Sequence, residues 1–173
     1  MGSLVPSMII ILMGVSGSGK TEIGRRLAAG TGWTFCDADD LHSVANREKM
    51  SRGEALTESD REPWLQSIAE RVRAWLGGEE DAILACSALT RGSRSTIGAD
   101  APGVRLVYLK GDYALIEQRI RSRQGHFFSP DLLRSQFDTL EEPEDAVVVD
   151  VGAEPGEVVA RIVQALGLRG EEF

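Results

Sequence analysis

The chain has 173 residues, of which 42% are hydrophobic and 27% charged, and its formal net charge is −8 with a pI near 4.8. That length suits a single compact domain with one sizeable core, so we expect one domain over residues 1–173. No stretch is dominated by lysine or arginine, which disfavours DNA or RNA as a partner and points to a small substrate.

Residues 1–7 show no hydrophobic period, and we expect them to form a loose tail. The apolar run over residues 8–13 is too short for a membrane span or a signal-peptide core, so we predict a cytoplasmic protein without membrane association. The run instead indicates a buried strand. Cys36 and Cys86 have no metal-site spacing and are expected to be buried free thiols.

The most specific motif follows this strand directly. Residues 14–21 read Gly-Val-Ser-Gly-Ser-Gly-Lys-Thr, which matches the phosphate-loop pattern Gly-x-x-x-x-Gly-Lys-Thr and leads into a helical pattern. Such glycines turn backbone N–H groups toward the β-phosphate, the lysine reaches the β and γ oxygens, and the hydroxyl can ligate Mg²⁺. The alternative, a glycine-rich turn with an exposed lysine, fits this strand-to-helix context poorly. We therefore predict bound ATP or GTP, held by Gly14, Val15, Ser16, Gly17, Ser18, Gly19, Lys20 and Thr21.

Strand-like and helix-like patterns alternate along the rest of the chain. This alternation predicts an α/β fold, in which a five-stranded parallel sheet lies between two helical layers. Ligands collect beyond the carboxyl ends of parallel strands, so the residues just after each run are the candidates for chemistry. The further apolar runs are 34–36, 82–86, 104–109 and 146–149, and the helical patterns include 65–76, 115–120 and 158–166.

An acidic segment, Asp37-Ala38-Asp39-Asp40-Leu41-His42, follows the second run. If the extended geometry persists, Asp37 and Asp39 point the same way, toward the phosphate loop. We assign Asp37 to Mg²⁺ and Asp39 to the acceptor hydroxyl as its base. A solvated acidic turn is the alternative, and it would be preferred without a phosphate loop opposite. We assign no proton transfer to His42, because phosphoryl transfer does not require an imidazole.

Two segments depart from the alternating pattern. Residues 37–77 are interpreted as a substrate-covering arm and residues 121–143 as a lid, since phosphoryl transfer needs water excluded. In the arm, Arg61 is a candidate for a carboxylate, which a planar guanidinium can grip through two hydrogen bonds. Ser59 and Glu62 have the spacing of a capping box and predict a helix start there.

Three arginines lie just before or at the start of the lid. Arg119 and Arg123 are four residues apart and are expected on one helical face beside adenine or the phosphates, whereas Arg121 points elsewhere as a surface charge. A wholly solvated face is the alternative. The following residues 125–128 place two phenylalanines in a loop, which is costly unless they close onto a ligand. His126, within that loop, is not assigned to proton transfer.

Further blocks outside the phosphate loop carry a family resemblance: residues 37–42, 46–50, 53–56, 60–65, 86–89, 109–112, 125–128 and 136–143. With these blocks the chain resembles the gluconate kinases, within the shikimate-kinase and adenylate-kinase-like P-loop kinases, from residue 10 to about residue 166. The resemblance implies ATP-dependent phosphorylation of D-gluconate at its 6-hydroxyl, with Mg²⁺ and commonly a homodimer.

Position by position, the resemblance implies roles for single residues. It makes Lys20, Asp39 and Arg123 catalytic, and places Arg119 and Arg123 near ATP. Residues 90–94 depart from the family, because Ser93 replaces a tyrosine while Arg94 is retained. Mg²⁺ is assigned to Thr21 and Asp37. The substrate is assigned to Asp39, His42, Arg61, Ser87, Arg94 and His126.

Two alternatives stay open. Arg61 and Asp39 would also suit another small hydroxy acid, such as shikimate. A nucleotide-controlled switch that hydrolyses NTP slowly is the alternative from another class. The chain has no Asn-Lys-x-Asp guanine motif, and residues 100–103 match the Asp-x-x-Gly switch pattern without a strand before them. Both features weaken the switch hypothesis.

Overall fold

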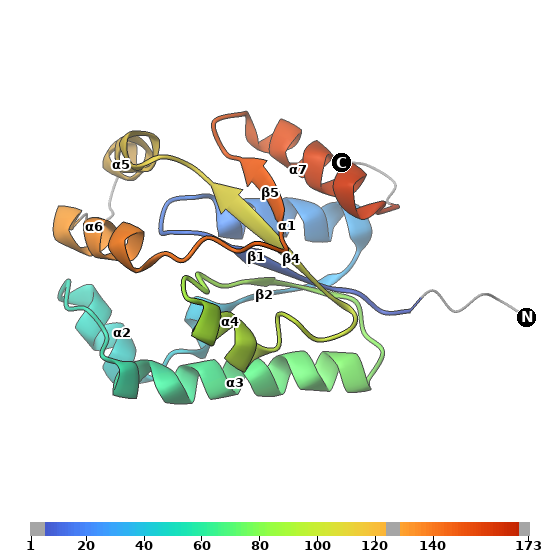
Figure 1. Cartoon of the computed structure of the whole chain (residues 1–173), viewed down its shortest axis with the longest axis horizontal. Helices are drawn as coiled ribbons and strands as arrows, with labels where there is room; N and C mark the ends of the chain where they lie inside the picture. The colour runs from blue at the N-terminus through green and yellow to red at the C-terminus, as the bar shows by residue number, and fades with distance from the viewer. Residues whose placement is uncertain (1–5, 124–128, 170–173) are drawn as a thin grey trace, which may run out of the picture.

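The computed structural model describes residues 6–123 and 129–169 (Figure 1). His126, which we assigned to the substrate, lies outside the described residues. The elements in chain order are β1 (Ile9–Met13), α1 (Lys20–Thr31), β2 (Thr34–Asp37), the 3₁₀ turn η1 (Ala38–Leu41), α2 (Val44–Ser51), α3 (Glu58–Gly77), β3 (Ala82–Ala85), α4 (Arg91–Ile97), β4 (Val104–Lys110), α5 (Tyr113–Ser122), α6 (Pro130–Thr139), β5 (Val147–Asp150) and α7 (Pro155–Leu166).

The strands form one parallel sheet in the order β2-β3-β1-β4-β5. The predicted five-stranded parallel α/β fold is therefore confirmed. The register places Ile11 of β1 opposite Leu84 of β3 and Leu106 of β4. Every residue of β1 is fully buried, as expected for the central strand of a sheet covered on both faces.

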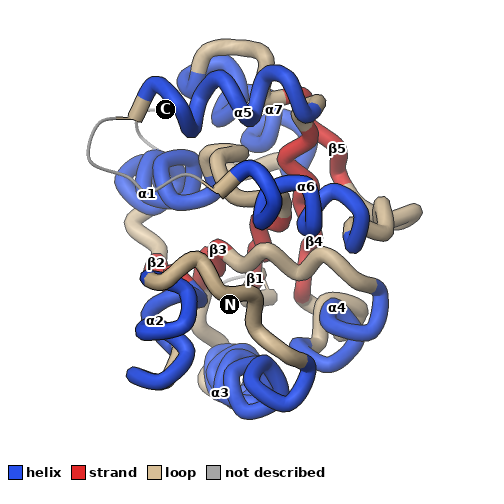
Figure 2. The backbone as a smooth tube through the Cα atoms, turned by 90° about the vertical axis from the view of Figure 1, so that its left-hand side faces the viewer, coloured by secondary structure: helices blue, strands red, loops and turns tan. Residues whose placement is uncertain are grey.

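Side chains alternate along β1 and so supply two cores. Ile10 and Leu12 pack with Leu27 of α1 and with residues of α7 on one face. Ile11 packs with Ile68 of α3 and with α4 on the other. Figure 2 shows the two layers, with α1, α5 and α7 on one side of the strands and α3 and α4 on the other. The phosphate loop, α2 and α6 gather at the carboxyl end of the sheet (Figure 1).

Helix α3 begins earlier than the predicted pattern and with a different cap. The Thr57 hydroxyl accepts the Asp60 N–H at 3.1 Å, and the Asp60 carboxylate accepts the Thr57 N–H at 2.9 Å. The predicted pair, Ser59 and Glu62, is wrong, because Ser59 already lies in the first helical turn. The capping box is instead formed by Thr57 and Asp60, which precede Arg61 in the chain.

Cys36 and Cys86 are both free thiols, as predicted. Cys86 is buried and Cys36 only partly so, and burial raises the pKa of the Cys86 thiol to about 12. Within residues 6–123 and 129–169, no helix combines the length and the apolarity needed to span a membrane.

Candidate active site

The phosphate loop joins the central strand to the N-terminus of α1. Gly19 caps that helix with φ 94°, a conformation that only glycine adopts readily. A Cβ on Gly17 would lie 2.6 Å from Cγ1 of Ile120, so α5 packs directly against the loop. Positive-φ glycines at a helix N-terminus turn N–H groups toward one concave side, which suits a phosphate group.

Lys20 reaches back over this loop. Its Nζ donates to the carbonyl oxygens of Gly14 at 2.8 Å and Val15 at 3.0 Å. Burial lowers the pKa of Lys20, while the nearby Asp39 carboxylate opposes that shift. The ammonium is thus held above the loop and close to the acidic edge of the sheet, where it can reach both a phosphate and its acceptor.

Asp37, the last residue of β2, lies beside the N-terminus of α1. Its Oδ2 accepts a hydrogen bond from Oγ1 of Thr21 at 2.6 Å. Among the described residues, no group of three or more histidine, cysteine or acidic side chains could hold a metal ion. A hydroxyl beside one carboxylate fits Mg²⁺, which usually keeps waters and phosphate oxygens as its remaining ligands.

The strand does not continue to Asp39, so the predicted alternation of the two carboxylates is wrong. The chain turns into η1 after Asp37, whose Oδ1 accepts the Asp39 N–H at 3.0 Å. This Asx-type cap brings the two carboxylates together within one turn. Partial desolvation and the Asp37 charge raise the pKa of Asp39, and Lys20 opposes them, although Asp39 is exposed to solvent. A carboxylate so placed is suited to accept a proton.

Arg61 lies in the first turn of α3 and is partly buried. Its neighbour Asp60 is held by Lys49, whose Nζ lies 2.7 Å from Oδ2, and the hydrogen bonds from Lys49 and Thr57 lower the pKa of Asp60 to about 2. Across the described part of the chain, no side-chain hydrogen bond or ion pair of Arg61 is found. Arg61 can therefore receive an external anion, such as a carboxylate.

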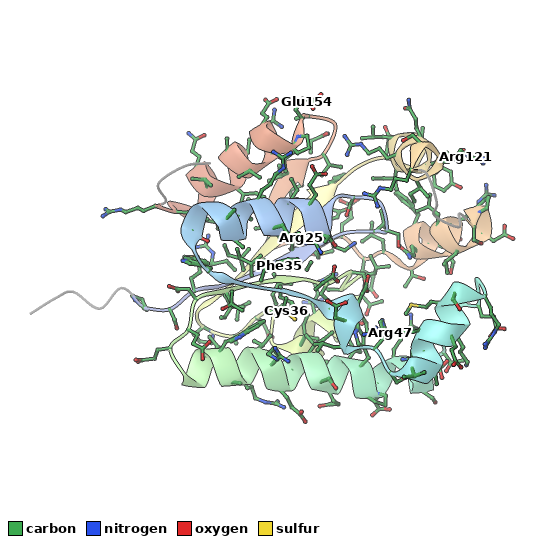
Figure 3. The ribbon with its side chains drawn as sticks, turned by 180° about the vertical axis from the view of Figure 1, so that it is seen from behind. Arg25, Phe35, Cys36, Arg47, Arg121 and Glu154 are labelled. Atoms are coloured by element: carbon green, nitrogen blue, oxygen red, sulfur yellow. The ribbon has the colours of Figure 1, made fainter. Side chains whose placement is uncertain are left out.

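Arg119 and Arg123 line a cavity of ≈ 250 Å³ on the other side of the loop. Helix α5 ends at Ser122, and Arg123 has extended backbone angles, so the expectation that both arginines share a helical face is wrong. Both still face the phosphate loop across this cavity. Its other lining residues are Gly17, Ser18, Gly19, Glu22, Ile23, Val151, Ala153, Glu154, Pro155 and Val158. Arg121 is exposed and pairs with Glu117 at 3.1 Å, as expected for a surface charge (Figure 3).

Comparisons with known proteins find relatives that cover most of the chain. A family model described as an AAA domain matches residues 9–143. The thermoresistant gluconokinase of Escherichia coli is 39% identical over 162 residues, covering 91% of this chain and 93% of that protein. The gluconokinase of Gluconobacter oxydans is 40% identical over 146 residues, covering 84% and 82%. The crystal structure of a gluconokinase from Sinorhizobium meliloti matches with a TM-score of 0.83 at 39% identity, covering 94% of this chain and 92% of that one.

The chain belongs to the gluconokinase family. A shikimate kinase from Bacteroides thetaiotaomicron shares the fold, with a TM-score of 0.64 at 15% identity. The predicted resemblance to gluconate kinases is confirmed.

In this gluconokinase-family site, Trp64 of α3 holds η1, the turn that carries Asp39. Nε1 of Trp64 donates to the Ala38 carbonyl at 2.7 Å, and the His42 ring stacks on Trp64 with centroids 4.2 Å apart. Nδ1 of His42 lies 3.3 Å from Nδ2 of Asn46, which can only donate, so Nδ1 is the acceptor and Nε2 carries the proton. Burial and the charge of Arg47 lower the pKa of His42. His42 therefore presents a neutral ring, and its predicted substrate contact would use Nε2–H.

We predict that Trp64→Phe destabilises the fold by about 1–3 kcal/mol and lowers turnover as well, because the buried Ala38 carbonyl loses its donor and η1 loses its anchor. Trp75→Phe is the matched control, since it removes a buried indole from the same helix away from the turn. Urea unfolding and steady-state kinetics measure the two effects. Equal kinetic effects of the two variants would contradict the anchoring role.

Arg94 lies behind the β3–α4 loop. Its Nη1 donates to the carbonyl of Ala88 at 2.9 Å and its Nη2 to that of Glu141 at 2.8 Å. Ala88 is buried with φ 45°, so this arginine supports a strained backbone next to Ser87. In the structure the guanidinium of Arg94 holds backbone groups, while Ser87 is partly exposed at the end of β3. Substrate contacts of both residues stay predictions.

Sequence reasoning did not assign Arg47. It lies on α2, and its Nη2 donates to the Asp40 carbonyl at 2.7 Å (Figure 3). Its charge lowers the pKa of Asp39 and so partly opposes the effect of burial. The one signal in the sequence was its place within the family block 46–50.

A larger cavity of ≈ 630 Å³ lies between α4, β4 and residues 141–147. Of the residues assigned to the site, only Arg94 lines it. Its size therefore does not mark the place of reaction.

Proposed function

We propose that the protein transfers the γ-phosphoryl group of ATP to the 6-hydroxyl of D-gluconate, giving 6-phospho-D-gluconate and ADP, with Mg²⁺. One observation carries the proposal. In a gluconokinase-family chain, the Thr21 hydroxyl at the end of a complete phosphate loop donates to the Asp37 carboxylate at 2.6 Å, and Asp37 in turn caps the turn that carries Asp39. Phosphoryl donor and acceptor can therefore be brought together at one edge of the sheet.

The residues have separate roles in this proposal. The loop amides and Lys20 bind the phosphates and neutralise their charge. Thr21 and Asp37 hold Mg²⁺, which when bound offsets charge on the transferring oxygens. Asp39 orients the acceptor hydroxyl and accepts its proton. Arg61 binds the gluconate carboxylate.

The cavity beside Arg119 and Arg123 supports a role for these arginines near the nucleotide, with Arg123 also stabilising the transferring group. We further propose that residues 37–77 cover the acceptor and residues 121–143 close over ATP, which would exclude water from the reaction. From the family resemblance, we also propose that the protein is a cytoplasmic homodimer.

A substrate panel tests the proposed function. Purified protein with MgATP is expected to release ADP fastest, by kcat/KM, with gluconate rather than with shikimate, glycerate, a nucleoside monophosphate or the uncharged polyol sorbitol. ATP turnover that ignores every added acceptor would instead support the nucleotide switch. A higher kcat/KM for another hydroxy acid would reassign the substrate.

Measured on the same substrates, Arg61→Met tests whether Arg61 binds the gluconate carboxylate. Charge-assisted hydrogen bonds contribute about 1.5–3 kcal/mol, so the preference for gluconate over sorbitol is expected to fall roughly 10-fold to 100-fold. Arg73→Met removes an exposed guanidinium from the same helix and serves as the control. An unchanged preference in Arg61→Met would place the carboxylate elsewhere.

A further inference from the structure

A glutamine from the lid segment is bound to the phosphate loop at two points. Oε1 of Gln136, on α6, accepts the backbone N–H of Ser16 at 2.8 Å, and Nε2 of Gln136 donates to Oγ of Ser16 at 2.9 Å. The two residues are 120 positions apart in sequence. A paired contact of this kind fixes the orientation of the amide as well as its position.

The contact joins the phosphate loop to α6, and further hydrogen bonds fix the residue that follows α6 at the same edge of the sheet. Just after α6, the N–H of Glu141 donates to the Leu89 carbonyl at 2.8 Å, and the Glu141 carbonyl accepts Nη2 of Arg94 at 2.8 Å. Figure 2 shows α6 lying between the helices of the two layers. The segment from Gln136 to Glu141 therefore bridges the phosphate loop and the β3–α4 loop, on whose side the acceptor is expected.

We propose that Gln136 is a positioning residue, which holds the first turn of the phosphate loop in register with the acceptor side of the site. The proposal rests on the proposed function for the identity of the reaction. Phosphoryl transfer depends mainly on in-line placement, and a misplacement of about 1 Å can cost on the order of 10²-fold in rate.

The chemistry of the glutamine suits this role. Its amide supplies the one acceptor and the one donor that the Ser16 N–H and hydroxyl require. It does so without a charge, whereas a glutamate here would repel phosphates and could not donate to the hydroxyl. Ser16 is exposed, so the contact is not needed to satisfy a buried group and is better explained by geometry.

Gln136→Met tests the proposal, because it keeps the length of the side chain and removes both hydrogen bonds. We expect kcat for gluconate phosphorylation to fall roughly 10-fold to 100-fold, with both KM values within about threefold and the melting temperature within about 2 °C. Ser135→Met, on an exposed neighbouring position of α6, is the control and should retain wild-type kinetics.

A double-mutant cycle with Ser16→Ala separates positioning from general packing. If Gln136 acts through Ser16, Ser16→Ala lowers kcat in the wild-type background but has little further effect in Gln136→Met. Effects of the two substitutions on kcat that multiply in the double variant would overturn the proposal. So would a kcat within twofold of wild type in Gln136→Met, or a loss of kcat that a lower melting temperature explains. Should Gln136→Met not fold, Gln136→Asn, which is too short for the contact, is read by the same criteria. Absence of gluconate phosphorylation in the wild-type protein would refute the proposed function instead.

Discussion

Replacing Asp39 with asparagine is expected to lower kcat for gluconate phosphorylation by roughly 10²-fold or more, with little change in ATP affinity. The variant keeps the size of the side chain and the η1 turn, because the hydrogen bond that caps the turn uses the Asp39 backbone N–H. It removes only the carboxylate that would accept the hydroxyl proton. A coupled ADP assay and calorimetry with MgATP measure the two quantities.

The pH dependence gives a second readout for Asp39. Burial and Asp37 raise the pKa of this carboxyl, and only its ionised form can accept a proton. Activity should therefore fall as the pH drops through a pKa above the usual aspartate value, and this acidic limb should be absent from Asp39→Asn. Asp40→Asn is the control, because Asp40 lies in the same turn but is not among the carboxylates whose charges act on Lys20. Near-normal turnover of Asp39→Asn would reduce Asp39 to a scaffolding residue.

Lys20→Met is expected to lower kcat/KM for ATP by roughly 10²-fold to 10³-fold, which is the usual cost of removing one strong donor from a transition state. The ammonium is held above the loop by its hydrogen bonds to the carbonyl oxygens of Gly14 and Val15, a position that a methionine side chain cannot fill with a donor. Steady-state kinetics over a range of ATP concentrations measures the loss.

Stability and a control variant separate this loss from unfolding. Burial lowers the pKa of Lys20, so the folded state disfavours its charged form, whereas Lys20→Met takes a donor from the carbonyls of Gly14 and Val15. These effects oppose each other, so the melting temperature is expected to change little. Lys110→Met removes an exposed lysine that pairs with Glu142 at 2.9 Å, and should keep wild-type activity. A loss of less than tenfold in Lys20→Met would contradict its role in transfer.

The sequence predicted those parts of the fold that depend on local patterns. The apolar run before the phosphate loop and its partners near Leu84 and Val107 became buried parallel strands, because period and burial agree along each run. The loop itself was predictable because its glycines and lysine are needed at fixed spacing. These patterns located the edge of the sheet where the candidate residues lie.

Features that depend on tertiary contacts were not predictable in the same way. Spacing alone fits both Ser59 with Glu62 and Thr57 with Asp60, and only the true start of α3 decides between them. The turn at Asp39 depends on a hydrogen bond from Trp64 to Ala38, 26 positions away. The contact between Gln136 and Ser16 joins residues 120 positions apart, and the one signal in the sequence was the place of Gln136 at the start of the family block 136–143.

The two sides of the site follow strands that differ in burial. The phosphate loop grows out of β1, the fully buried centre of the sheet, whereas the turn with Asp39 grows out of β2, an edge strand with no fully buried residue. Amide hydrogen exchange should therefore be slowest in β1 and much faster in β2, since edge segments open in local fluctuations that leave the centre intact. On heating, the turn with Asp39 would then lose its structure before the whole protein unfolds. Activity would therefore be lost at a lower temperature than that of global unfolding.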